Sequence, residues 1–202
     1  MPLTPFHYVL AYAIRKAGRR LGRDIDMAGL AMGSFAPDLE CLVFIILDRL
    51  GVLYMPYHRL VLHSILGCLT LGSLAAILMA LAAYRLFAPR GLERPGLRRF
   101  YAASALGNLS HVLIDAVHHY YNPLLFPFTM SNVLALVPFT HTELGRSLAS
   151  GFERWAGLQP GTGPFFLATL LVYAVVLPSA AYIIVREWRR GGNLLVRLLF
   201  DV

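Results

Sequence analysis

The chain has 202 residues, a usual length for one domain, and no stretch of it is typical of a linker. Hydrophobic residues make up 57% of the sequence and charged residues only 14%, whereas soluble domains carry about 25% charged residues. A soluble protein of this size could not cover so many apolar side chains with so few charged ones, which excludes a soluble enzyme. Two cysteines are also too few for a disulfide scaffold. We therefore expect one all-α domain over residues 1–202, a polytopic transmembrane helix bundle.

The N-terminal stretch 5–14 is apolar but too short to span, because a helix needs about 20 residues to cross the hydrocarbon core. Basic residues follow this stretch instead of preceding it, which is the wrong order for a secretory signal peptide. We expect a short helix that dips into the bilayer.

Four later stretches are long and apolar enough to predict spanning helices. They are residues 28–47, 60–84, 100–121 and 165–185. The second and fourth contain no Asp, Glu, Lys or Arg, whereas the first and third carry carboxylates or histidines within the apolar run. The first and third spans are therefore expected to have polar sides facing the interior of the bundle.

The remaining segments are predicted to lie at or near the membrane surface. Residues 124–139 contain Pro127 and Pro138, so we expect a re-entrant or interfacial loop packed on protein instead of a helix. Residues 141–143 are expected to form an exposed polar turn, and the tail 194–201 a short interfacial helix.

The basic residues predict the orientation of the bundle. Four spans place 14 of the 18 Lys and Arg residues on one side of the membrane, in three clusters. The clusters are Arg15, Lys16, Arg19, Arg20 and Arg23; Arg85, Arg90, Arg94, Arg98 and Arg99; and Arg186, Arg189, Arg190 and Arg197. Basic loops stay cytoplasmic, which predicts an integral protein of the cell (inner) membrane with these loops inside. No nucleic-acid partner is expected, because the cations flank apolar helices instead of lining one face with aromatic residues.

The third predicted span carries a stripe of polar residues. His111, Asp115, His118 and Asn122 fall within about 60° of one another on a helix. Ionisable groups at bilayer depth are costly and therefore indicate a functional site. A histidine and an aspartate four apart can bind one metal ion, or the carboxylate can orient the imidazole, so His118 also counts as a candidate ligand. The alternative is a hydrogen-bonded seam between helices.

The first predicted span is interrupted at Pro37, which is followed by Asp38 and Glu40. Residues two apart point to nearly opposite sides of a helix, so these carboxylates can share an ion only where the backbone is irregular. Asp38 is the expected ligand of the two. The alternative is that one or both pair with an arginine or cap a helix end.

Three further histidines are candidate ligands. His58 and His63 would diverge by about 140° on a helix, so joint binding requires that His58 lie in a loop. Asp38, His111 and Asp115 lie roughly 18 to 24 Å above the basic clusters, at about 1.5 Å per residue. His63 lies higher and His7 lower, so a shared pocket in the outer half of the membrane requires tilted helices or a dipped N-terminal segment. The alternative for each of these three histidines is that it lies alone at the membrane interface and is only hydrated.

The order of the motifs resembles a known family. They are Thr4-Pro5-Phe6-His7, Pro37-Asp38-Leu39-Glu40, His58-Arg59-x3-His63-Ser64, Gly107-x3-His111-x3-Asp115, and Pro123 followed by Phe126-Pro127. The order and spacing of these motifs, over about residues 4–128, resemble those of the membrane-bound metal-dependent hydrolases. That family includes the YdjM-like, LexA-regulated inner-membrane proteins. That family is distantly similar to zinc-dependent phospholipase C. Residues 165–202 carry none of these motifs.

The resemblance implies a metal site and a reaction. Its metal ligands would be His7, Asp38, His63, His111 and Asp115, with His58 and Glu40 as further ligands or as partners of ligands. Mixed imidazole and carboxylate ligands suit Zn²⁺, and also Mn²⁺.

As a hypothesis, metal-activated water attacks a lipid or lipid-linked phosphodiester or ester. Glu40 or Asp115 would take the proton, and Arg59 would hold a phosphate, unless it is only an anchor at headgroup level. Membrane lipid is then both the environment and the substrate. The alternative is a non-catalytic membrane protein, a transporter or an assembly subunit, that uses the same intramembrane residues. The oligomeric state is left open.

Overall fold

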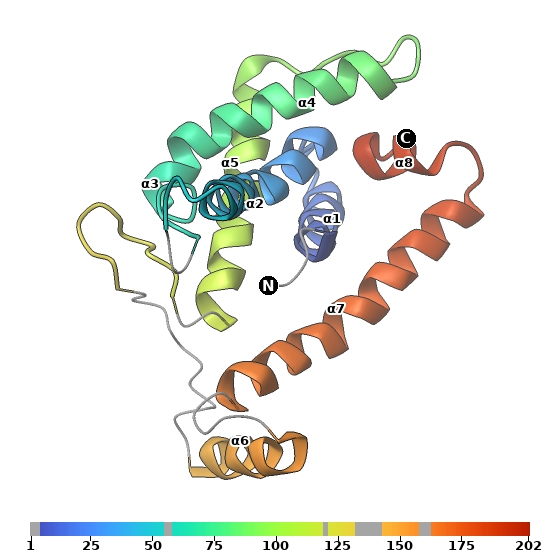
Figure 1. Cartoon of the computed structure of the whole chain (residues 1–202). Coiled ribbons are helices and arrows are strands. Elements are labelled where there is room, and N and C mark those ends of the chain that lie inside the picture. The colour runs from blue at the N-terminus through green and yellow to red at the C-terminus, as the bar shows by residue number, and fades with distance from the viewer. Residues whose placement is uncertain (1–4, 55–57, 119–120, 132–142, 158–162) are drawn as a thin grey trace.

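The computed structural model is all α-helical over the residues that it describes, 5–54, 58–118, 121–131, 143–157 and 163–202 (Figure 1). Its helices are α1 (Pro5–Arg20), α2 (Met27–Arg49), α3 (Ile65–Gly67), α4 (Ser73–Phe87), α5 (Leu97–His118), α6 (Glu143–Ala156), α7 (Gly163–Arg189) and α8 (Leu194–Phe200). A π-helical segment, Cys68–Gly72, joins α3 to α4, so that residues 65–87 form one long helix. The predicted all-α class is confirmed.

Helix α2 occupies the centre of the bundle, where it packs against α1, α4 and α5 (Figure 1). It begins at Met27 because the side chain of Asp26 caps it by accepting a hydrogen bond from the backbone N–H of Gly29. The helix continues through Pro37 without ending there. Asp38 and Glu40 therefore diverge, as two residues so spaced on a regular helix must.

Two glycines allow α2 and α5 to cross closely. A Cβ atom on Gly33 would lie 2.3 Å from the carbonyl oxygen of Ser104, and one on Gly107 would lie 2.2 Å from that of Leu30. No side chain fits at either position without separating the helices. This close crossing brings the middle of α5, which carries His111, against the middle of α2.

Two of the predicted spans are helices with the length and composition of membrane spans, namely α2 and the long helix Ile65–Phe87. The other two stretches lie in α5, of 22 residues, and α7, of 27 residues. At 1.5 Å per residue these helices are roughly 33 and 40 Å long, enough to cross a hydrocarbon core of about 30 Å. Their insertion, and the orientation of all four, remain predictions.

The prediction that a helix begins at residue 60 is wrong, because the helix begins at Ile65. The carboxylate of Glu40 holds the backbone N–H groups of residues 60–62 in a turn instead. The Ser64 side chain then caps the helix by accepting from the N–H of Gly67, 2.9 Å away.

Other boundaries also differ from the predictions. Helix α1 continues to Arg20, and α5 ends at His118, so Asn122 lies beyond the helix and donates from its side chain to the Val112 carbonyl, 3.0 Å away. The polar turn expected at 141–143 is in part the start of α6, which begins at Glu143.

The loop predicted over residues 124–139 is described as far as residue 131. Leu124 is buried beside Cys68, Val112 and Ala116, and its carbonyl accepts from the N–H of Ile65 at 2.9 Å. The start of the loop is therefore packed on protein, as expected, whereas Leu125, Phe128 and Met130 are exposed. Residues 132–139 lie outside the described residues.

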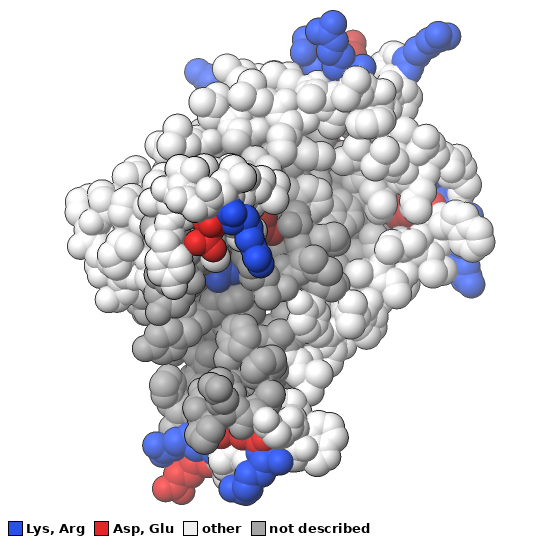
Figure 2. Space-filling model, in the orientation of Figure 1, with Lys and Arg blue, Asp and Glu red and all other residues white. Residues whose placement is uncertain are grey.

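Charges on the face drawn in Figure 2 gather mainly at the ends of the molecule. Basic side chains lie at the upper edge, over the turn between α4 and α5, and at the right edge near α8; acidic and basic ones lie at the bottom, over α6 (Figures 1 and 2). Between these ends, one small group of acidic and basic side chains lies on the otherwise uncharged surface. Leu42, Val43 and Ile46 of α2 are about half exposed, the surface expected of a helix that faces lipid.

Buried ion pairs fasten the C-terminal tail to α1. The carboxylate of Asp201, only 2% exposed, lies 3.3 Å from Nε of Arg15, 2.6 Å from Nζ of Lys16 and 2.9 Å from Nη1 of Arg19. Arg15 also donates to Asp24, at 2.6 Å, and this hydrogen bond lowers the pKa of the Asp24 carboxyl. The first predicted basic cluster thus holds the end of the chain.

Asp201→Asn should lower the free energy of unfolding by about 3 kcal/mol, because Arg15, Lys16 and Arg19 converge on this buried carboxylate and would lose their shared anion. Asp24→Asn removes a carboxylate that also pairs with Arg15 but is 68% exposed, so its cost should stay below about 1 kcal/mol. Thermal or denaturant unfolding of the two variants in detergent measures the difference. Equal losses would contradict the assignment of Asp201 as the anion that secures the tail.

Candidate metal centre

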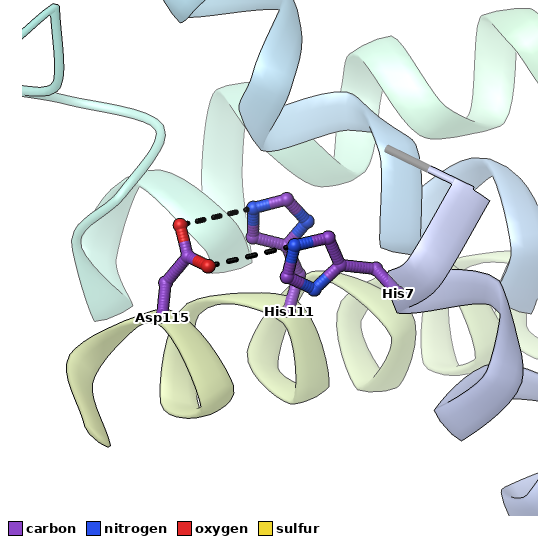
Figure 3. A group of neighbouring side chains, drawn as sticks. All are labelled: His7, His111 and Asp115. Atoms are coloured by element: carbon purple, nitrogen blue, oxygen red, sulfur yellow. Dashed lines mark ion pairs between the residues drawn. The ribbon is translucent and has the colours of Figure 1, made fainter. Parts of the chain in front are cut away.

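Five candidate ligand residues from four segments meet inside the bundle. His7 comes from α1, Asp38 from α2, His63 from the turn before α3, and His111 and Asp115 from α5. All except Asp38 are at most 3% exposed. Figure 3 shows the carboxylate of Asp115 facing the rings of His7 and His111. The N-terminal segment thus reaches the depth of the α5 residues, as a shared site required.

The separations in this group are those of ligands around a shared cation. Asp115 Oδ1 lies 3.4 Å from His7 Nε2, and Asp115 Oδ2 lies 3.6 Å from His111 Nε2. Asp38 Oδ1 also lies 3.6 Å from His111 Nε2. These distances exceed those of good hydrogen bonds. Two nitrogen or oxygen ligands of one tetrahedral zinc ion, each about 2.0–2.2 Å from the metal, lie roughly 3.4 Å apart.

The ring of His111 is oriented for metal binding. Its Nδ1 lies 2.7 Å from the backbone carbonyl of Ser34, which can only accept, so Nδ1 carries the proton. In the neutral ring, Nε2 then presents its lone pair. This nitrogen is buried, makes no hydrogen bond within the described residues and faces both carboxylates. A backbone carbonyl that orients a histidine in this way is the usual partner of a ligating imidazole.

Glu40 orients His63 in the same manner. Its Oε2 lies 3.2 Å from His63 Nδ1, and its two oxygens accept the backbone N–H groups of Leu60, Val61 and Leu62 at 2.6 to 3.2 Å. His63 Nε2 consequently faces the centre, 3.7 Å from Asp115 Oδ2. The carboxylate of Glu40 thus positions a ligand residue, which leaves it poorly placed to accept a proton from water.

Arg59 is buried at the centre, only 7% exposed, and its Nη2 lies 3.2 Å from Asp115 Oδ2. This burial beside Asp115 favours a role at the centre over the alternative of an anchor at headgroup level. A buried guanidinium beside a carboxylate adds fixed positive charge to the centre.

The two other predicted ligand residues are His58 and His118. His58 turns away from the centre, and its Nε2 lies 4.0 Å from a carboxylate oxygen of Asp48. The backbone of His118 ends α5, but its side chain lies outside the described residues, as do His119 and His141.

A second group of potential ligands contains a residue that the sequence analysis missed. Potential ligand atoms of Asp38, Cys41 and His63 all lie within 4.8 Å of one another, as do those of His7, His111 and Asp115. Cys41 follows Asp38 by three residues on α2, a spacing that places both side chains on one face of the helix. That spacing was the available signal.

The comparisons with known proteins agree with the motifs. The chain matches the YdjM inner membrane protein family over residues 3–188. This match extends through most of α7, well beyond the 4–128 region that carries the motifs. No curated protein and no solved structure matches the chain.

Proposed function

This chain belongs to the YdjM inner membrane protein family, and we propose that it is a metal-dependent hydrolase of a lipid or lipid-linked phosphodiester or ester. The observation that carries the proposal is the buried convergence of His7, Asp38, His63, His111 and Asp115 at ligand-like spacings. Helices that form only a structural seam have no need to bring three imidazoles and two carboxylates to one point.

The donors in this group fit a divalent cation, with Zn²⁺ favoured over Mn²⁺ by the three imidazoles. His111 supports the fit most directly, because its unbonded Nε2 faces two carboxylates while its Nδ1 is held by a carbonyl. When bound, the ion would supply a water molecule of lowered pKa and a Lewis acid for a phosphoryl or acyl oxygen.

Other steps would depend on side chains of the centre, which would accept the proton, bind the phosphate and position a ligand. Asp115 would accept the proton from the attacking water at one of its carboxylate oxygens. Arg59, beside Oδ2 of the same carboxylate, would hold a phosphate oxygen with its guanidinium group. Glu40 would act only through His63.

The surroundings of the centre support a lipid substrate. Asp38 lies on α2 and His63 lies just before the long helix Ile65–Phe87, the two helices with the length and composition of membrane spans. The exposed side chains in the middle of α2, Leu42, Val43 and Ile46, are aliphatic. A substrate that already resides in the bilayer can approach such a site sideways, whereas a free polar substrate would have to leave water.

A lipid hydrolysis assay tests the proposed function. Purified protein in mixed micelles with glycerophospholipids should release water-soluble headgroup products, should lose this activity with a chelator and should regain it with Zn²⁺. Asp115→Asn should abolish release, while His58→Ala, which alters a histidine outside the centre, should not. Metal-loaded protein that releases no product, but supports ion flux in proteoliposomes, would refute the hydrolase and favour the transporter alternative.

Glu40→Gln is expected to weaken zinc binding by about 10- to 100-fold, the usual effect of losing the partner of a ligating histidine. The amide accepts through one atom only, and its NH₂ group would face N–H donors of the 60–62 turn and His63. Competition with a chromophoric chelator measures the affinity. Glu93→Gln, in the α4–α5 turn, is the control, and equal affinities in both variants would argue against the role assigned to Glu40.

A further inference from the structure

We propose that the centre holds two zinc ions, the second bound by the Cys41 thiolate together with Asp38 and His63. This inference rests on the proposed function and deepens it. The first ion belongs to the group His7, His111 and Asp115, and the second to the group that contains the cysteine.

The three donors of the second group come from two adjacent segments. Cys41 and Asp38 share one face of α2, and His63 projects from the turn that precedes α3. Cys41 Sγ lies 3.9 Å from His63 Nε2. A thiolate and an imidazole on one tetrahedral zinc ion, at about 2.3 and 2.0 Å from the metal, lie roughly 3.6 Å apart. The observed separation is close to that value.

His63 is oriented to complete the site. Because Glu40 holds the proton on Nδ1, the lone pair of Nε2 points toward the thiol of Cys41. Both side chains are buried, so bulk water would not compete with them for the ion. With the thiol protonated this pair forms a weak hydrogen bond, and loss of the thiol proton converts both atoms into ligands.

Cys41 has no disulfide partner that would compete with this role. Both cysteines are free and buried, and the other, Cys68, donates from its thiol to the carbonyl of Leu62 at 3.4 Å. Cys68 therefore has a structural hydrogen bond, whereas Cys41 faces ligand atoms.

The carboxylates connect the two groups. Asp38 Oδ1 lies 3.6 Å from His111 Nε2 of the first group, and Asp115 Oδ2 lies 3.7 Å from His63 Nε2 of the second. Each group thus offers an oxygen to the other, which is the arrangement that lets two ions act on one substrate. A thiolate ligand also favours zinc over harder ions such as Mn²⁺ or Mg²⁺.

Metal counting with matched cysteine variants tests this inference without an activity assay. Wild-type protein, purified without chelators and supplied with Zn²⁺, should contain two ions per chain, and X-ray absorption at the zinc edge should show a sulfur neighbour at about 2.3 Å. Cys41→Ser should reduce the count to one and remove the sulfur neighbour. Cys68→Ser should change neither.

The possible results separate this inference from the proposed function. One ion per chain without a sulfur neighbour, unchanged by Cys41→Ser, would overturn the second site and leave the hydrolase proposal standing. No bound ion at all would overturn both. The absorption measurement uses the wild-type protein, so it decides the question even if the Cys41→Ser variant fails to fold.

Discussion

The His111→Ala variant is expected to bind zinc more than about 100-fold more weakly than the wild-type protein, and therefore to purify without stoichiometric metal. His111 Nε2 lies close to both carboxylates, at 3.6 Å from Asp38 Oδ1 and from Asp115 Oδ2. Alanine removes this ligand and leaves Asp38 and Asp115 without the imidazole that lies beside both of them. Elemental analysis of detergent-purified protein provides the measurement.

His58→Ala is the matched control for this prediction. His58 is a histidine of the same chain that lies near Asp48 instead of the centre. Its removal should leave the metal content at the wild-type level. If both variants lost metal equally, the loss would reflect general destabilisation; if neither lost metal, His111 would not be a ligand.

The second large effect concerns the crossing of α2 and α5. Gly107→Val should prevent the native packing of the bundle, at a cost well above the roughly 1–3 kcal/mol of ordinary overpacking. Even the Cβ atom would lie 2.2 Å from the Leu30 carbonyl oxygen, and backbone cannot move aside as a flexible side chain can. Helix α5 would be pushed from α2, and His111 would separate from Asp38.

Gly151→Val provides the control, since Gly151 lies in α6 and nothing comes within 4 Å of a Cβ atom built there. The same substitution in a helix should therefore leave the melting temperature and the metal content close to wild type. Size-exclusion profiles and thermal unfolding in detergent distinguish the variants. A Gly107→Val protein that remained monodisperse, with unchanged melting temperature and metal content, would contradict the proposed role of the crossing.

Composition and helical periodicity predict the fold class and most of the helices, because both depend on local chemistry. The divergence of Asp38 and Glu40 and the alignment of His111 with Asp115 follow from positions along one helix. The start of the long helix at Ile65 cannot be predicted from local sequence, because Glu40 of another helix holds the turn before it.

Long-range contacts likewise decide which side chains reach the centre. His58 and His63 are only five residues apart, yet one faces Asp48 and the other Glu40, since the conformation of the intervening turn sets their directions. The ion pair of Arg59 with Asp115 also joins residues far apart in sequence. Cys41 is hard to predict for a related reason: its spacing of three residues from Asp38 indicates a ligand only once the fold has placed His63 beside both.

An anomalous difference map recorded at the zinc edge, from crystals of protein purified without chelators, tests the central claim most directly. The account predicts a strong peak about 2.0–2.2 Å from His111 Nε2 and from an oxygen of Asp115, inside the bundle. A map from well-ordered crystals with no peak within bonding distance of either residue would contradict it.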